Sequence, residues 1–215
     1  MRLVIFDLDG TLIQASSERL FARYLQVHGC LGWRQIAEFA SFAVRYGMLY
    51  RGAVLKKNKA YLAGLPRERV NELARRFIDD ELVGTLYRPA LTRLERHLAS
   101  HDLVLLLTGT PDFIAQPLAV RLGLAHVIAT DCSTRKDVFT GAPPRRHPFG
   151  RDKLRHAREF AAQHGADLTR AVAYANARED RFLLANVGEA VAVRPDLRLR
   201  GLARRAGWEI LEART

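Results

Sequence analysis

Hydrophobic residues in this chain follow two patterns, short continuous runs and stretches with helical spacing. Uninterrupted apolar runs occupy residues 3–6, 103–107, 171–175 and 190–193. Runs of this length are typical of strands that are buried on both faces of a parallel sheet. Elsewhere apolar residues recur every three or four positions, which predicts amphipathic helices. The chain is therefore expected to be a mixed α/β protein.

Strands and helices alternate in the second half of the chain. Further strands are predicted at residues 126–130 and 208–211, with a short hairpin near 137–140. Such alternation predicts a doubly wound, mostly parallel Rossmann-like sheet. The helices of this part are predicted at residues 112–122, 151–164, 180–186 and 196–206.

Residues 13–87 have no strand pattern and predict an all-helical insertion after the first strand. Ser16 and Ser17 are candidate N-caps for its first helix. The second helix is expected at residues 33–46, with Gly47 and Gly52 as breaks. One face of that helix would carry Ile36, Phe39, Ala40 and Ala43. Two later helices of the insertion are expected at about 54–62 and 66–78, and a further helix at about 89–98 follows the insertion. The catalytic core would then comprise residues 1–12 and 88–215.

Composition and charge narrow the function classes. The chain has 215 residues, 48% of them hydrophobic, and no apolar run approaches the roughly 20 residues that span a bilayer. Cys30 and Cys132 lie far apart and match no metal-site spacing, and so few cysteines fit a reducing compartment. The first strand begins at residue 3, which leaves no room for a signal peptide before it. Both features favour a cytoplasmic protein. The net charge of +11 comes from 29 Arg and only 5 Lys, spread along the chain. This even distribution indicates a general preference for Arg on solvent-exposed faces. The alternative is a basic surface that binds nucleic acid.

The candidate chemistry begins with two carboxylates, Asp7 and Asp9, directly after the first strand. Gly10 follows and permits a sharp exit from the sheet. Ligands of open α/β sheets bind at the carboxyl ends of the strands. Acids placed there can serve as nucleophile, as acid and base or as metal ligands.

Three further segments place polar groups at strand ends or helix starts. Thr108 and Gly109 end the central strand and could donate a hydroxyl and a backbone N–H to an anion. Lys153 lies early in a helix and is a candidate fixed cation, with Arg151 and Arg155 as nearby competitors. The segment after the strand at 171–175 supplies the polar residues Asn176 and Asp180.

Together these motifs resemble those of the haloacid dehalogenase-like (HAD) hydrolases, and the tail resembles the phosphoserine-phosphatase-like branch, subclass IB. The resemblance implies a Mg²⁺-dependent phosphomonoester hydrolase with a helical cap at residues 13–87. It also implies a small phosphorylated metabolite as substrate, such as phosphoserine or histidinol phosphate. The family normally has an acid where this chain has Asn176, so we expect weaker metal binding.

The resemblance also implies roles for individual residues. Asp7 would attack phosphorus and form an aspartyl-phosphate, while Asp9 would be the acid and base. Thr108, Gly109 and Lys153 would bind the phosphoryl oxygens. The implied metal ligands are Asp7, the Asp9 backbone carbonyl, Asn176 and Asp180.

The substrate contacts of the insertion are less defined. Glu18 and Arg19 follow the nucleophile loop and are candidates for contact with the leaving group. Lys56, Lys57 and Lys59 are expected on a solvated face, with substrate binding as the alternative. A different function remains open as well: a weakened HAD fold that binds a phosphorylated ligand as a regulatory module, for which Asn176 is the supporting feature.

Overall fold

The centre of the protein is a six-stranded parallel sheet in the order β3-β2-β1-β6-β7-β8. The computed structural model describes residues 2–50 and 54–212. Parallel pairing without a hairpin requires crossovers, and each crossover carries helices. The strands are β1 (Leu3–Phe6), β2 (Leu103–Pro111), β3 (His126–Thr130), β6 (Val172–Ala175), β7 (Glu189–Val193) and β8 (Glu209–Leu211).

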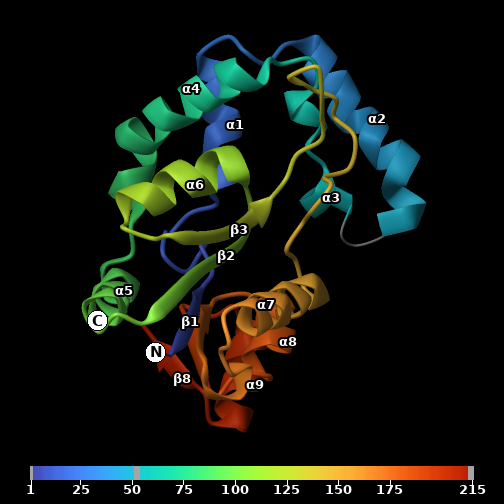
Figure 1. Cartoon of the computed structure of the whole chain (residues 1–215). Helices are drawn as coiled ribbons and strands as arrows, with labels where there is room; N and C mark the ends of the chain where they lie inside the picture. Colours follow the sequence, from blue (N-terminus) through green and yellow to red (C-terminus); the bar gives the residue numbers. More distant parts are fainter. Residues whose placement is uncertain (1, 51–53, 213–215) are drawn as a thin grey trace.

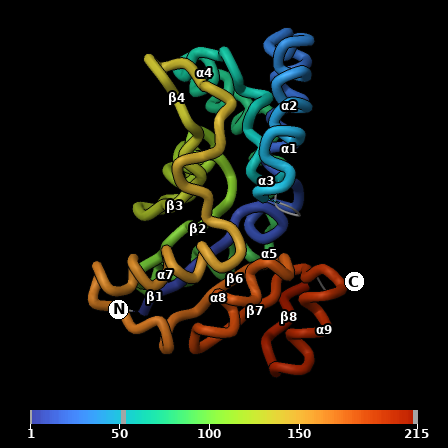
Figure 2. The backbone as a smooth tube through the Cα atoms, turned by 90° about the vertical axis from the view of Figure 1, so that its right-hand side faces the viewer, coloured from blue at the N-terminus to red at the C-terminus, as the bar shows by residue number. Residues whose placement is uncertain are grey.

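Helices cover both faces of the sheet, which confirms the doubly wound α/β fold (Figures 1 and 2). Val4 and Phe6 point into one apolar cluster, while Leu3 and Ile5 point into the other. This alternation along β1 is what a strand buried on both faces requires. The first cluster is covered by α5 (Arg88–Ala99) and α6 (Asp112–Arg121), and the second by α7 (Arg151–Gln163), α8 (Arg181–Leu184) and α9 (Leu197–Ala206).

β1 lies at the switch point of the sheet. Its neighbours are β2 on one side and β6 on the other, so the chain leaves β1 in one direction and later returns on the opposite side. Phe6 pairs with Tyr174 in the register of β1 and β6, and the two rings stack with centroids 4.2 Å apart. Crevices at such switch points are where doubly wound folds bind ligands.

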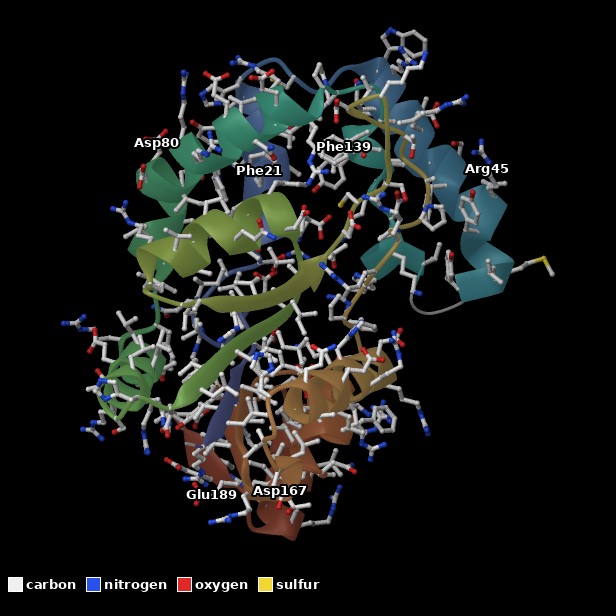
Figure 3. The ribbon with its side chains drawn as sticks, in the orientation of Figure 1. Phe21, Arg45, Asp80, Phe139, Asp167 and Glu189 are labelled. Atoms are coloured by element: carbon white, nitrogen blue, oxygen red, sulfur yellow. The ribbon has the colours of Figure 1, made fainter. Side chains whose placement is uncertain are left out.

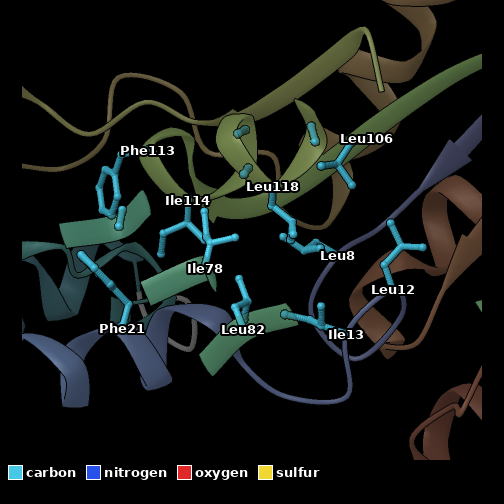
Figure 4. Packing of buried hydrophobic residues seen from close by; sticks show 14 of the residues in the cluster. Leu8, Leu12, Ile13, Phe21, Ile78, Leu82, Leu106, Phe113, Ile114 and Leu118 are labelled. Carbon is cyan, nitrogen blue, oxygen red and sulfur yellow. The ribbon is translucent and has the colours of Figure 1, made fainter. Parts of the chain in front are cut away.

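Helices fill the chain between β1 and β2. Their apolar sides join the first cluster, where Ile78 and Leu82 meet Leu8 and Ile13 from the loop after β1 (Figure 4). The helices are α1 (Ser17–Val27), α2 (Trp33–Tyr50), α3 (Val54–Lys57), a 3₁₀ turn (Ala60–Leu62), α4 (Arg67–Phe77), a π turn (Ile78–Leu82) and a second 3₁₀ turn (Val83–Thr85).

The prediction for α2 was wrong in its length and in its buried face. The helix continues through Gly47 to Tyr50, because Tyr46 and Tyr50 both pack near Phe42 and hold the last turn. Phe42 is its single buried residue, whereas Ile36 is 69% exposed. Phe39 and Ala40 are exposed and Ala43 is only half-buried, so the expected face is not the core face. Figure 3 shows Arg45 on this outer helix. The break expected at Gly52 lies outside the described residues.

Local side-chain bonds explain other shifts of element boundaries. The helix expected at 54–62 is interrupted at Asn58, whose side chain accepts from the Ala60 N–H and donates to the Phe39 carbonyl. Ser16 occupies the N-cap position of α1 without a capping side-chain bond. In the part of the chain that the structure describes, no helix combines the length and apolar character needed to cross a membrane.

A small hairpin ties the helical insertion to the rest of the chain. It consists of β4 (Thr134–Arg135) and β5 (Val138–Phe139), joined by Lys136 and Asp137 with positive φ angles of 49° and 58°. Phe139 donates its N–H to the Leu65 carbonyl and accepts the Gly64 N–H. The hairpin therefore fixes the segment before α4 over the edge of the sheet at which β2 and β3 end.

Candidate active site

Asp7 and Asp9 lie where the sequence predicts, at the carboxyl end of β1. The Asp7 N–H donates to the Tyr174 carbonyl at 2.9 Å, which continues the β1–β6 pairing up to the acid itself. Gly10 has a φ of +76°, a conformation that favours glycine, and turns the chain away from the sheet. Asp7 is only 8% exposed, so its carboxylate is held in a site with little water.

Lys153 joins two acids that follow different strands, β1 and β6. Its Nζ lies 2.8 Å from Oδ1 of Asp7 and 2.8 Å from Oδ1 of Asp180. Burial alone would lower the pKa of Lys153, but the two carboxylates outweigh it and raise that pKa. Burial raises the pKa of Asp180 to about 6, although Lys153 opposes the shift. Burial likewise raises the pKa of Asp7. One lysine therefore neutralises only part of the charge of this pair.

Asp9 is held by three donors that converge on a single oxygen. Its Oδ1 accepts from the Ser17 N–H at 3.1 Å, from the Ser17 hydroxyl at 2.6 Å and from the Thr110 hydroxyl at 3.2 Å. Burial raises the pKa of Asp9, and the Ser17 hydrogen bonds oppose that shift. A carboxyl group fixed through one oxygen keeps the other available for a proton.

Thr108 and Gly109 lie beside these acids at the end of β2. Thr108 is buried, donates its hydroxyl to Thr110 at 3.1 Å and accepts the Thr110 N–H at 3.1 Å. The hydroxyl of Thr110 reaches Asp9, so the end of β2 and the loop after β1 share one network. This network places the predicted anion donors and the predicted acid and base side by side.

A cavity of about 580 Å³ opens onto this network. It is lined by every predicted site residue: Asp7, Asp9, Glu18, Arg19, Thr108, Gly109, Lys153, Asn176 and Asp180. The structure thus brings residues from three strand ends, from the start of α7 and from the insertion to one place. Lys56 and Lys59 of the insertion also line the cavity.

Lys59 corrects the expectation of a solvated lysine face. It is only 3% exposed and its ammonium donates to Glu18 at 2.5 Å and to the Lys56 carbonyl at 2.9 Å. Burying a charge is costly unless it is paired, and Glu18 supplies the pair. Glu18 and Lys59 are 41 positions apart, which no local pattern in the sequence connects.

Ser17, Thr110 and His147 are site residues that the sequence did not identify. Ser17 stood out only as a candidate cap, and its hydroxyl instead binds Asp9. His147 follows Pro143 and Pro144 in an irregular loop, lines the cavity and is 8% exposed. Loop residues of this kind carry no periodic signal, so their positions appear only once the fold is known.

The donor set fits a divalent cation. Asp7 and Asp180 are buried and Asp9 is half-buried, but Lys153 is the single buried cation bonded to any of these three acids among the described residues. Excess negative charge from oxygen ligands is what Mg²⁺ sites provide. The Asn176 side chain occupies the space beside Gly10 that a β-carbon would fill, so its amide lies close to the Asp7–Asp9 loop. No cluster of three or more His, Cys, Asp or Glu arranged for a metal occurs in residues 2–50 and 54–212, and the predicted set instead combines two carboxylates with an amide and a carbonyl.

Comparisons with known proteins agree with this geometry. The family model described as haloacid dehalogenase-like hydrolase matches residues 4–185. A phosphoserine phosphatase of Mycobacterium tuberculosis is 31% identical over 97% of this chain and 70% of its own length. A histidinol-phosphatase of Neisseria meningitidis is 29% identical over 97% of both chains. A Bordetella pertussis protein of unknown function has a similar crystal structure, with a TM-score of 0.82, 28% identity and 98% of both chains covered.

Proposed function

The chain belongs to the haloacid dehalogenase-like hydrolases and is a phosphatase of that family, and we propose that it hydrolyses small phosphomonoesters with the help of Mg²⁺. The observation that carries the proposal is the contact of Lys153 with both Asp7 and Asp180 inside the cavity. Phosphoryl transfer needs a nucleophile beside fixed positive charge, because the phosphoryl oxygens carry the charge of the transition state.

In the proposed mechanism Asp7 attacks phosphorus and forms an aspartyl-phosphate. Asp9, fixed through Oδ1, gives a proton to the leaving oxygen and then takes one from the water that cleaves the intermediate. Lys153, the Thr108 hydroxyl and the Gly109 N–H hold the phosphoryl oxygens. The Thr108 hydroxyl would have to turn from Thr110 towards the ligand.

Mg²⁺ would be held by Asp7, the Asp9 carbonyl, Asn176 and Asp180. When bound it supplies positive charge that offsets the negative charge of the phosphoryl group. In this assignment Asp180 also keeps Lys153 in place, because their ion pair is buried on both sides. Asn176 contributes an oxygen without a charge, so the proposed site has one negative charge fewer than the family's usual set.

We assign residues 13–87 as the cap and residues 1–12 and 88–215 as the catalytic core. Glu18, Lys56 and Lys59 bring groups of the cap to the cavity wall. A cap that closes over the site excludes water and selects the leaving group. The relatives named above make phosphoserine and histidinol phosphate the first compounds to test.

The test is hydrolysis of 4-nitrophenyl phosphate, followed by a panel of phosphorylated metabolites, with and without Mg²⁺. We expect Mg²⁺-dependent release of phosphate that Asp7→Asn abolishes. Asp152→Asn is the matched control, since Asp152 is a half-exposed acid whose partner is Arg155 on the outer side of the same helix as Lys153. Full turnover by Asp7→Asn would refute the mechanism, and absence of hydrolysis with every compound would refute the function.

A further inference from the structure

His147 has a buried ring nitrogen that no group of the protein uses. Its Nε2 is enclosed and has no hydrogen-bond partner among the described residues, although the ring lines the active-site cavity. A buried polar atom without a partner costs about 1–3 kcal/mol. An unpartnered buried atom in a native site calls for an explanation, and one explanation is that a bound ligand supplies the partner.

Hydrogen bonding on the other side of the ring determines which nitrogen carries the proton. The Thr130 hydroxyl has one hydrogen, and it donates to the Gly109 carbonyl at 2.6 Å because a carbonyl can only accept. The contact of 2.9 Å between Thr130 Oγ1 and His147 Nδ1 must then be donated by Nδ1. A neutral ring that is protonated at Nδ1 has a lone pair at Nε2.

The surroundings keep this ring neutral. Burial, together with the positive charges of Lys59, Lys57 and Lys153, lowers the pKa of His147 to about 3. Nε2 is thus an acceptor, and an acceptor does not bind an anionic phosphoryl group. The ring edge next to Nε2 faces Gly109, since the His147 Cε1 lies 3.6 Å from the position that a Gly109 β-carbon would take.

We propose that His147 Nε2 forms a specificity subsite that accepts a hydrogen bond from an N–H or O–H group on the organic part of the substrate. The subsite lies in the active-site cavity, beside Gly109 of the core. Its preferred substrates are phosphomonoesters with an amino or hydroxyl group a few bonds from the ester oxygen. This inference rests on the proposed phosphatase function and adds the class of leaving group.

Lys59 is the positive charge with the largest effect on the His147 ring. Its ammonium already donates to Glu18 and to the Lys56 carbonyl, which holds it on the cap side. The lining of the cavity therefore includes a carboxylate, an ammonium and a neutral acceptor. For an amino or hydroxyl group of a ligand in this cavity, Glu18 and His147 are the candidate acceptors.

Two substitutions separate recognition from positioning. In His147→Asn the amide NH₂ can replace Nδ1 as the donor to Thr130, but no atom remains at the place of Nε2. In His147→Gln the amide oxygen can reach the place of Nε2, while the donor to Thr130 is lost. The substrates are 2-aminoethyl, 2-hydroxyethyl and propyl phosphate, which have similar length and differ in the terminal donor.

The measurement is the ratio of kcat/KM for each donor-bearing ester to that for propyl phosphate. We expect wild type to favour both donor-bearing esters, and His147→Asn to lower the ratios about 10-fold, the value of one hydrogen bond. His147→Gln should retain the preference although its stability falls. Unchanged ratios in His147→Asn, or equal losses in both variants, would overturn the proposal.

Ring ¹⁵N NMR tests the same claim without catalysis. The Nε2 signal should be that of an unprotonated nitrogen, and it should shift with 2-hydroxyethyl phosphate but not with propyl phosphate. A proton on Nε2, or equal shifts with both esters, would contradict the subsite. Wild type that hydrolyses 4-nitrophenyl phosphate but shows no donor preference would refute the subsite alone, whereas wild type inactive on all esters would refute the proposed function.

Discussion

The Lys153 ammonium lies 2.8 Å from the Asp7 carboxylate, and both groups are buried at the carboxyl end of the sheet. The same ammonium also contacts Asp180, so a single cation orders the ends of β1 and of the segment after β6. The site depends on this arrangement for its geometry as well as for its charge.

Replacing Lys153 should therefore affect both stability and activity. Lys153→Met leaves two buried carboxylates without their cation, and breaking a buried pair in this way costs about 3–5 kcal/mol. We expect this loss in urea unfolding without Mg²⁺, together with at least a 100-fold loss of phosphatase activity. Lys136→Met is the control, because Lys136 is an exposed hairpin residue. Equal stability of the two variants would contradict the role of Lys153.

The pKa of Asp180 predicts a pH dependence of stability in the metal-free protein. Because the folded-state pKa is raised to about 6 from 3.8, protonation favours the folded state. The contribution is fully present below about pH 4 and is lost as the pH rises through 6. The free energy of unfolding of wild type, relative to Asp180→Asn, should fall over this interval in EDTA. A difference that is constant with pH would contradict this assignment.

Asn176→Asp tests the charge of the proposed metal site. The variant adds a carboxylate beside Gly10 and the Asp7–Asp9 loop, where the family usually has one. We expect about 10-fold tighter binding of Mg²⁺, and a lower Tm without the metal because the half-buried new carboxylate lies close to the loop that carries Asp7 and Asp9. Asn186→Asp provides a control at an exposed position. Unchanged Mg²⁺ affinity in a titration of activity and of Tm would remove Asn176 from the metal site.

Ser17→Ala tests how Asp9 is held. The variant removes the 2.6 Å hydrogen bond to the carboxylate, so the pKa of Asp9 should rise further. The acidic limb of the pH–rate profile, where Asp9 must be ionised to activate water, should move to higher pH, and kcat should fall about 10-fold. The neighbouring Ser16→Ala should have the profile of wild type, because Ser16 is exposed and its side chain makes no cap bond. Identical profiles for both variants would refute the positioning role.

Much of the fold follows from local sequence. The run at 103–107 identifies β2 because five consecutive apolar residues suit a strand covered on both faces. The grouping of Asp7, Thr108 and Lys153 was also predictable in outline, since the carboxyl ends of parallel strands share one edge. The roles of these residues in catalysis stay predictions until the variants are measured.

Other features depend on tertiary contacts that the sequence does not encode locally. Lys59 is buried because Glu18, from helix α1, reaches it, and its sequence neighbours Lys56 and Lys57 are not buried. Trp33 and Met48 remain 82% and 95% exposed on a helix whose pattern suggested a core face. The tautomer of His147, a loop residue, is set by Thr130 at the end of β3.

The central claim is that Asp7 becomes phosphorylated during turnover. Its most direct test is an acid quench of the protein mixed with 4-nitrophenyl phosphate and Mg²⁺, followed by borohydride, which reduces an aspartyl-phosphate to homoserine. Peptide mass spectrometry should find homoserine at position 7 in wild type and nowhere in Asp7→Asn. Homoserine at another position, or full turnover by Asp7→Asn without any labelled residue, would contradict the account.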